Sequence, residues 1–177
     1  MTIAATAFIH ERATVLGHVT LGERVSVWPG AVVRGDNAPV VVGDDSNIQD
    51  GAILHVDDGV PCVIGARVTV GHRAIVHGAT VEDECLIGMG AIVLNNAVIG
   101  RGSLVAAGAL VPEGMVVPPG SLAVGVPAKL KPLSAEQAAR IAHGYTSYVA
   151  MSRRHARGEF VRHVSGVDAR AASPDSE

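Results

Sequence analysis

Aromatic side chains are almost missing from this sequence. Phe, Tyr and Trp make up 3% of the 177 residues, although 48% of the residues are hydrophobic. A chain of this length can bury one sizeable core. Without large rings that core must be filled by Val, Ile, Leu and Ala, which favours a regular, repeated interior. The 21 glycines indicate that the chain turns often.

Further absences exclude other classes of protein. No apolar run approaches the roughly 18 residues needed to span a bilayer, and the N-terminus lacks the pattern of a signal peptide. The net charge of −3 gives no strong attraction to nucleic acid or an anionic membrane. Cys62 and Cys85 have neither disulfide-framework nor zinc-finger spacing, so we expect them to be small core residues. We therefore predict a cytoplasmic protein that binds neither nucleic acid nor membranes.

An aliphatic residue recurs every sixth position from Ile9 to Ala123, with two insertions. The last part of this series is unbroken and comprises Val81, Ile87, Val93, Ile99, Val105, Val111 and Val117. A period of six fits neither an α-helix nor an alternating strand, but it is typical of a β-helix built from hexapeptides. Nineteen such rungs, three to a coil, predict an all-β solenoid of about six triangular coils over residues 1–128.

The character of the sequence changes after residue 128. Pro127 and Pro132 interrupt the repeat, and Ser134 with Gln137 resembles a capping box. We expect one C-terminal α-helix from about 135 to 156, within a segment 133–157 that packs on the solenoid. Its apolar positions are Ala138, Ile141, Ala142, Tyr145, Tyr148 and Val149. The composition of residues 165–177 predicts a disordered tail.

Three histidines occupy informative places in the repeat. His55 follows Leu54 and His77 follows Val76, and these two rungs are one full coil apart. Coils stack about 4.8 Å apart, so both imidazoles should lie on one face and reach one metal ion. His72 belongs to a different face. Because catalytic zinc takes about three protein ligands, we predict a homotrimer in which His72 of a neighbouring subunit completes each site.

Other polar residues share these columns. Arg34 stacks one coil below His55, and Asp50 lies one coil below His72. With the histidines, these residues form a polar group near the middle of the solenoid whose other members are Asp36, Asn47 and Gln49.

The strings VVRGDNAPVVVGDDSNIQDGAILH and IGARVTVGHRAIVHGATVEDECLIGMGAIV resemble the gamma-class carbonic anhydrase family, as does PPGSLAVGVPAKLKPLS with the following helix. The resemblance covers about residues 8 to 156. It implies a left-handed, trimeric β-helix with the metal ligands His55, His72 and His77. It also implies an inter-subunit ion pair of Arg34 with Asp36, and a Gln49 that hydrogen-bonds metal-bound solvent in polar surroundings formed by Asn47 and Asp50.

The activity implied by the resemblance is reversible hydration of CO₂ to bicarbonate. The metal would be Zn²⁺, with Fe²⁺ or Co²⁺ as alternatives, and a hydroxide on it would attack CO₂. The archetypal enzyme has an acidic loop with a glutamate proton shuttle after the first ligand. This chain has only the short stretch VDDGVPC there and Asn37 where a second glutamate stands. Asp57, Asp58 and Tyr148 are the remaining candidates for a shuttle.

Three alternative functions fit the same repeat. A hexapeptide acyltransferase would use acetyl-CoA and a single catalytic histidine rather than three ligands. An acyl-CoA thioesterase is a related alternative. A non-catalytic assembly protein would keep the fold, with or without the metal.

Overall fold

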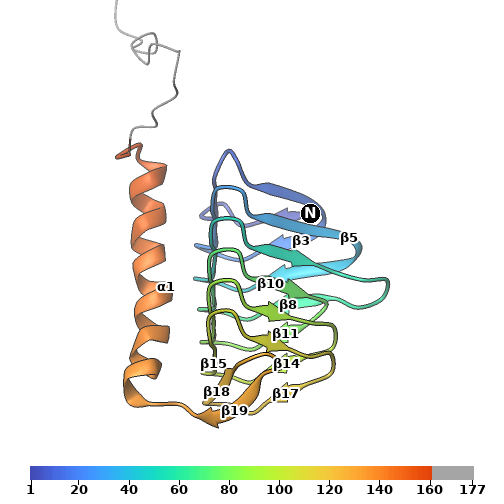
Figure 1. The fold of residues 1–177 in the computed structure, drawn as a ribbon. Coiled ribbons are helices and arrows are strands. Elements are labelled where there is room, and N and C mark those ends of the chain that lie inside the picture. Colours follow the sequence, from blue (N-terminus) through green and yellow to red (C-terminus); the bar gives the residue numbers. More distant parts are fainter. Residues whose placement is uncertain (161–177) are drawn as a thin grey trace, which may run out of the picture.

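The computed structural model describes residues 1–160, which form a parallel β-solenoid followed by one α-helix. The solenoid has about seven coils rather than the six predicted. The additional rung comes from β1 (Thr2–Ile3), which pairs in parallel with the end of β3, Thr2 against Thr20. The chain enters at one end of the stack and leaves at the other, as Figure 1 shows.

Every coil contributes one strand to each of three faces, and we name these faces by their contents. The helix face, which lies under the C-terminal helix, comprises β2 (Phe8–Ile9), β4 (Ser26–Val27), β6 (Asn47–Ile48), β9 (Thr69–Val70), β12 (Leu86–Ile87), β15 (Leu104–Val105) and β18 (Ser121–Val124), followed by the antiparallel β19 (Lys129–Pro132). The histidine face comprises the first halves of β3 (Thr14–Leu21) and β5 (Val32–Val42), then β7 (Ile53–His55), β10 (Ile75–His77), β13 (Ile92–Val93) and β16 (Leu110–Val111). The third face comprises β1, the second halves of β3 and β5, and then β8 (Cys62–Ile64), β11 (Thr80–Val81), β14 (Val98–Ile99) and β17 (Val116–Val117).

The core runs along the solenoid axis and consists of the aliphatic rung residues. Leu54 pairs in register with Val33 below and Val76 above, and all three are fully buried. Cys62 and Cys85 are also fully buried, which confirms the prediction that they are small core residues. Burial raises the pKa of Cys62 to about 12 and that of Cys85 to about 11, so both thiols stay protonated near neutral pH.

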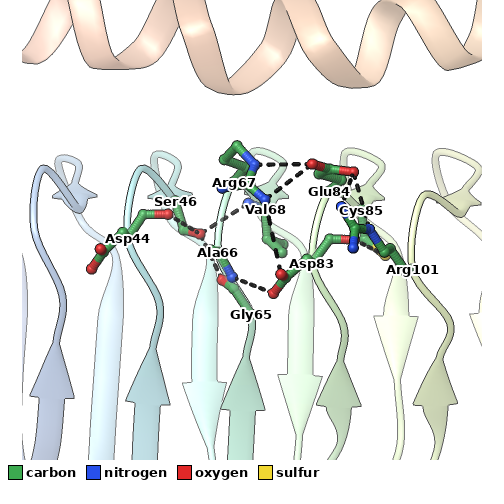
Figure 2. Close-up of polar contacts among 10 residues, drawn as sticks. All are labelled: Asp44, Ser46, Gly65, Ala66, Arg67, Val68, Asp83, Glu84, Cys85 and Arg101. Carbon is green, nitrogen blue, oxygen red and sulfur yellow. Dashed lines mark hydrogen bonds and ion pairs between the residues drawn. The ribbon is translucent and has the colours of Figure 1, made fainter.

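Charged side chains stack along the corner between the third face and the helix face. Glu84 lies between Arg67 of the coil below and Arg101 of the coil above, with N–O distances of 3.0 and 3.1 Å (Figure 2). At this corner Arg67 and Glu84 adopt the left-handed backbone conformation, with φ of 56° and 58°. Ser46 lies beneath them and bonds the carbonyl of Gly65 at 2.8 Å. Polar contacts between coils therefore reinforce the backbone ladder at this corner.

The helix α1 spans Ala135–Ala156, the range expected from the sequence, and begins with the Ser134–Gln137 capping box. It stands beside the solenoid along the helix face (Figure 1). Ile141 and Ser152 form the buried centre of its contact stripe. The expectation that Ala138 and Ala142 also pack inward was wrong, because both lie at the margin of the stripe and are exposed.

Within the described chain no helix is both long and apolar enough to cross a membrane. The cytoplasmic location stays a prediction. The expected disordered tail, 165–177, lies outside the described residues.

Candidate metal centre

His55 and His77 are direct neighbours on the histidine face. They pair in register at the ends of β7 and β10, as the rung count predicted. Their ring centroids lie 4.9 Å apart, and Nδ1 of His55 faces Nε2 of His77 at 3.0 Å. Both side chains point outward, since the alternating neighbours Leu54 and Val76 fill the core.

The outer nitrogen of each of these rings is held by an acceptor. Nε2 of His55 bonds Oδ1 of Asp36 at 3.0 Å, and Nδ1 of His77 bonds Oδ1 of Asn95 at 2.7 Å. The amide of Asn95 is oriented by Asp57, whose carboxylate accepts from its Nδ2 at 2.6 Å. The hydrogen-bond partners therefore assign a proton to each outer nitrogen. In the neutral rings, two unprotonated nitrogens then face each other across 3.0 Å.

Such a pair of lone pairs is repulsive until a cation lies between or beside them. Two ligand nitrogens on one tetrahedral zinc are about 3.3 Å apart, given zinc–nitrogen bonds of about 2.0–2.1 Å. The pair of His55 and His77 therefore fits two positions of a metal's coordination shell. Across residues 1–160 no group of three His, Cys, Asp or Glu side chains in one chain is arranged to hold a metal ion. Within the described residues, one chain therefore brings two histidines together here without a third such side chain.

His72 lies at the corner between the helix face and the histidine face, away from the other two histidines. Its Nδ1 is 3.0 Å from the carboxylate of Asp50, one coil below, and its Nε2 is 3.3 Å from the hydroxyl of Tyr148 on α1. Because Asp50 can only accept, the proton is assigned to Nδ1 and the lone pair to Nε2. His72 therefore presents an unprotonated nitrogen at the corner of the solenoid.

The amide residues expected near the site lie beside His72, not beside the other histidines. Oε1 of Gln49 accepts from the backbone N–H of His72 at 3.1 Å, and its Nε2 donates to Oδ1 of Asn47 at 3.1 Å. Asn47 in turn donates to Thr69 at 3.0 Å. Each end of the Gln49 amide has capacity for one more hydrogen bond. These contacts fix the orientation of the Gln49 amide, and the residue is only 6% exposed.

Arg34 and Asp36 form an ion pair within one chain, because they lie two residues apart on the same side of β5. Asp36 also accepts from His55. Burial raises the pKa of Asp36, but the hydrogen bonds from His55 and Arg34 outweigh this and lower it. Asp36 is therefore a carboxylate near neutral pH. An ion pair between subunits stays a prediction.

Tyr148 reaches His72 because aromatic contacts hold it against the helix face. Its ring meets that of Trp28 edge to face at 5.2 Å, and Trp28 also packs on His155 at 4.9 Å. Burial, and secondly the charge of Asp50, raise the pKa of Tyr148. Its hydroxyl consequently keeps its proton near neutral pH and acts as a donor to His72.

A cavity of about 310 Å³ lies between α1 and the helix face beside Gln49. Apolar groups dominate its lining, and its wall includes Leu86, Leu104, Met89 and Gly144. A small apolar molecule could occupy this space next to the Gln49 amide.

Sequence reasoning missed Asn95. It lies in the coil above His77, two residues after Val93, which pairs with Val76, so it stands one position beyond the residue in register with His77. Its amide still reaches the His77 ring at 2.7 Å. Coil spacing therefore indicates its neighbourhood but not this contact. Asp57 was considered only as a proton shuttle, whereas it contacts Asn95 and also lies 3.9 Å from Nε2 of His77. Asp58 is exposed.

Comparisons with known proteins agree with the fold and the repeat. The model of the bacterial transferase hexapeptide (six repeats) matches residues 78–113. A carbonic anhydrase of Geobacillus kaustophilus is 53% identical over 72% of this chain and 70% of its own length. Protein YrdA of Escherichia coli is 43% identical over 83% of this chain and 84% of its own.

Among solved structures, a hexapeptide transferase family protein from Anaplasma phagocytophilum superposes with a TM-score of 0.82 at 38% identity. That match covers 86% of this chain and 90% of the other. These identities and coverages show that the chain belongs to the gamma carbonic anhydrase-like family of hexapeptide-repeat proteins.

Proposed function

We propose that this protein reversibly hydrates CO₂ to bicarbonate at a metal site between the subunits of a homotrimer. His55 and His77 of one subunit and His72 of its neighbour are the ligands in this proposal. Family membership implies a metal cofactor in general terms. We propose Zn²⁺, with Fe²⁺ or Co²⁺ as alternatives.

The observation that carries the proposal is the 3.0 Å approach of two imidazole nitrogens, on rings whose other nitrogens each contact an acceptor oxygen. A pair of neutral histidines that merely filled space would share a proton between these nitrogens. Here acceptors at both outer ends draw the protons away from the gap. A divalent cation satisfies both lone pairs at once.

The need for a neighbouring subunit follows from the position of His72. Its Nε2 lies at a different corner from the other two histidines, beside the Tyr148 hydroxyl, and in this proposal it serves a site on another chain. The histidine face also carries an outward stripe of aliphatic side chains that are half-buried in the single chain. This stripe comprises Val32, Ile53, Ile75, Ile92 and Leu110. A row of apolar residues beside the histidines suits contact with a second copy of this chain.

When bound, the metal acidifies a water molecule for attack on the carbon of CO₂. The chain's own residues orient the surroundings. Asp50 holds the proton of His72 on Nδ1 and so keeps Nε2 available. Gln49 accompanies His72, because its Oε1 is bonded to the His72 backbone, and it offers its remaining hydrogen-bonding capacity to the reacting oxygen. Asn47 keeps the amide in that orientation.

A proton must leave the site in each cycle. Asp57 lies 3.9 Å from Nε2 of His77 and is exposed, so it can pass a proton to solvent. Tyr148 suits this task less well, because its raised pKa keeps the hydroxyl protonated. We assign Asp57 as the shuttle; Tyr148 is a donor to Nε2 of His72 in the metal-free chain.

The test combines elemental analysis with a CO₂-hydration assay on protein purified with and without oxygen. The proposal expects about one divalent ion per subunit, equal to three per trimer, and hydration that a chelator abolishes and the metal restores. Stoichiometric metal without hydration in either preparation would favour the assembly protein. Absence of metal together with acyl transfer from acetyl-CoA, or hydrolysis of an acyl-CoA, would favour the CoA-dependent alternatives.

A further inference from the structure

Asn95 and Asp57 lie next to the candidate centre without being ligands in the proposal above. Asn95 sits at the corner above β10, and Asp57 belongs to the short insertion after β7. The two side chains are 38 residues apart in sequence, yet they bond each other at 2.6 Å. Their contact is therefore a product of coil stacking and not of local sequence.

Both side chains belong to one chain of polar contacts, in which every link except the one between the two histidines is a hydrogen bond. In order of contact, its members are Arg34, Asp36, His55, His77, Asn95 and Asp57. A carboxylate stands near each end, and carboxylates accept but do not donate. Each carboxylate therefore draws donors toward itself, and the ring protons of His55 and His77 both point away from the gap between the two rings.

We infer that Asn95, oriented by Asp57, is a positioning residue that fixes His77 in the Nδ1-protonated form and aims its Nε2 at the metal. The inference rests on the proposed function for the metal itself, but the tautomer is a property of the metal-free chain. If the Asn95 amide were reversed, its oxygen would face the Asp57 carboxylate at 2.6 Å and its nitrogen would face the protonated Nδ1. Both contacts are repulsive, so Asp57 excludes this orientation.

Asp36 has the same positioning role for His55, on the opposite side of the histidine pair. Its carboxylate contacts Nε2 of His55 directly, whereas Asp57 acts on His77 through the Asn95 amide. The two ligands are thus prepared from opposite ends of the chain. Removing one end should disturb one histidine and leave the other in place.

The test compares Asn95→Leu, which has a similar size and no acceptor, with the exchange variant Asp57→Asn/Asn95→Asp. In the exchange variant the new carboxylate accepts from His77 and the new amide donates to it, so the hydrogen bonds are kept with their roles exchanged. Asn96→Gly is the control, because it changes the neighbouring corner residue while allowing the left-handed φ of 59° found there.

The first measurement is the imidazole ¹⁵N spectrum of metal-free, histidine-labelled protein in mildly alkaline solution, with His77 identified by its loss in His77→Gln. We expect the Nδ1-protonated form of His77 in the native protein, the control and the exchange variant. Asn95→Leu should shift His77 toward the Nε2-protonated form. An unchanged His77 spectrum in Asn95→Leu would overturn the inference, whether or not the protein binds metal.

The second measurement is the Zn²⁺ affinity of the same chelator-treated proteins by competition with a chromophoric chelator. Asn95→Leu should bind about 10- to 100-fold more weakly, and the exchange variant should recover most of this loss. Equal affinity of Asn95→Leu and native protein would contradict the positioning role. Failure of native protein to bind Zn²⁺, with the expected tautomer present, would refute the proposed function and the metal-directed part of this inference, while leaving the tautomer assignment standing.

Discussion

The hydroxyl of Tyr148 lies 3.3 Å from Nε2 of His72, the ring nitrogen that Asp50 leaves without a proton. The C-terminal helix therefore contacts the candidate centre at the one histidine that the solenoid presents from a different corner. In a metal-loaded site this hydroxyl and the metal would compete for the same lone pair.

Replacing Tyr148 by Phe should increase metal affinity. The loss of one hydrogen bond to Nε2, worth about 0.5–1.5 kcal/mol, corresponds to about 2- to 10-fold tighter binding. Chelator competition on the purified protein measures this. Tyr145→Phe, on the same helix and half-buried, is the matched control and should leave the affinity unchanged. Weaker binding by Tyr148→Phe would mean that the hydroxyl supports the ligand instead of competing for it.

Gly144 sets the distance between α1 and the helix face. A Cβ at this position would meet Oγ1 of Thr69 at 2.8 Å, so a larger side chain must push the helix outward. Gly144→Leu should cost about 1–3 kcal/mol in the free energy of unfolding, measured in urea. The fluorescence of Trp28, the single tryptophan, should also change because its contacts are with Tyr148 and His155.

Ala142→Leu is the control for this substitution, since it adds a similar volume at an exposed position of the same helix. It should alter neither stability nor fluorescence appreciably. If both variants behaved alike, close packing at Gly144 would not be what docks the helix.

Glu84 should contribute to stability at neutral pH and lose this contribution in acid. The hydrogen bond from Arg101 is the main cause of its lowered pKa; burial opposes the shift, and Arg67 adds to it. A carboxylate with a lowered folded-state pKa stabilises the protein above its ordinary value of 4.5, and this stabilisation disappears as the pH falls through the folded-state pKa. For a partly exposed pair the effect is below about 1 kcal/mol and salt weakens it.

The measurement is urea unfolding of the native protein and of Glu84→Gln, from neutral pH into the acid range, at low and high salt. The two should differ in stability at neutral pH and converge in acid. Glu136→Gln, which breaks the exposed pair with Arg140, should show a smaller difference. A Glu84→Gln difference that persisted unchanged in acid would point to packing and not to charge.

Mixed trimers test whether a site is shared between subunits. His55→Ala and His72→Ala subunits should each lack metal binding alone. After exchange in equal amounts, about one quarter of the sites should regain all three ligands. A mixture of His55→Ala with His77→Ala should regain none, because those ligands come from the same subunit. Recovery in the second mixture, or none in the first after verified exchange, would contradict the shared site.

The hexapeptide period was enough to predict the solenoid, because in such a fold one repeated position decides which side chains are buried. The same count predicts that His55 lies beside His77, as the strand register has it. This count gave too few coils, because β1 lies in an exposed and incomplete first coil. The periodicity also gave the corner of His72 correctly.

Contacts that depend on the docking of α1 or on the insertion after β7 were not accessible in the same way. Tyr148 could be listed from its sequence position, but its reach to His72 depends on Gly144 and Trp28. The role of Asn95 depends on how residues 56–61 fold back over the next coil, where Asp57 bridges to Val60. Insertions have no register, so periodicity does not place their side chains.

The antiparallel strand β19 covers one backbone edge at the C-terminal end of the coil stack. A stack of parallel coils that ended bare would offer its last backbone edge to the first coil of another copy, and such additions would continue into a filament. Here Leu122 of β18 already pairs with Lys131 of β19, which runs in the opposite direction. Lys129, Lys131 and Pro132 make its outer side charged and short of N–H donors. At the C-terminal end of the stack, β19 therefore covers the edge of the helix face and opposes end-on strand pairing there.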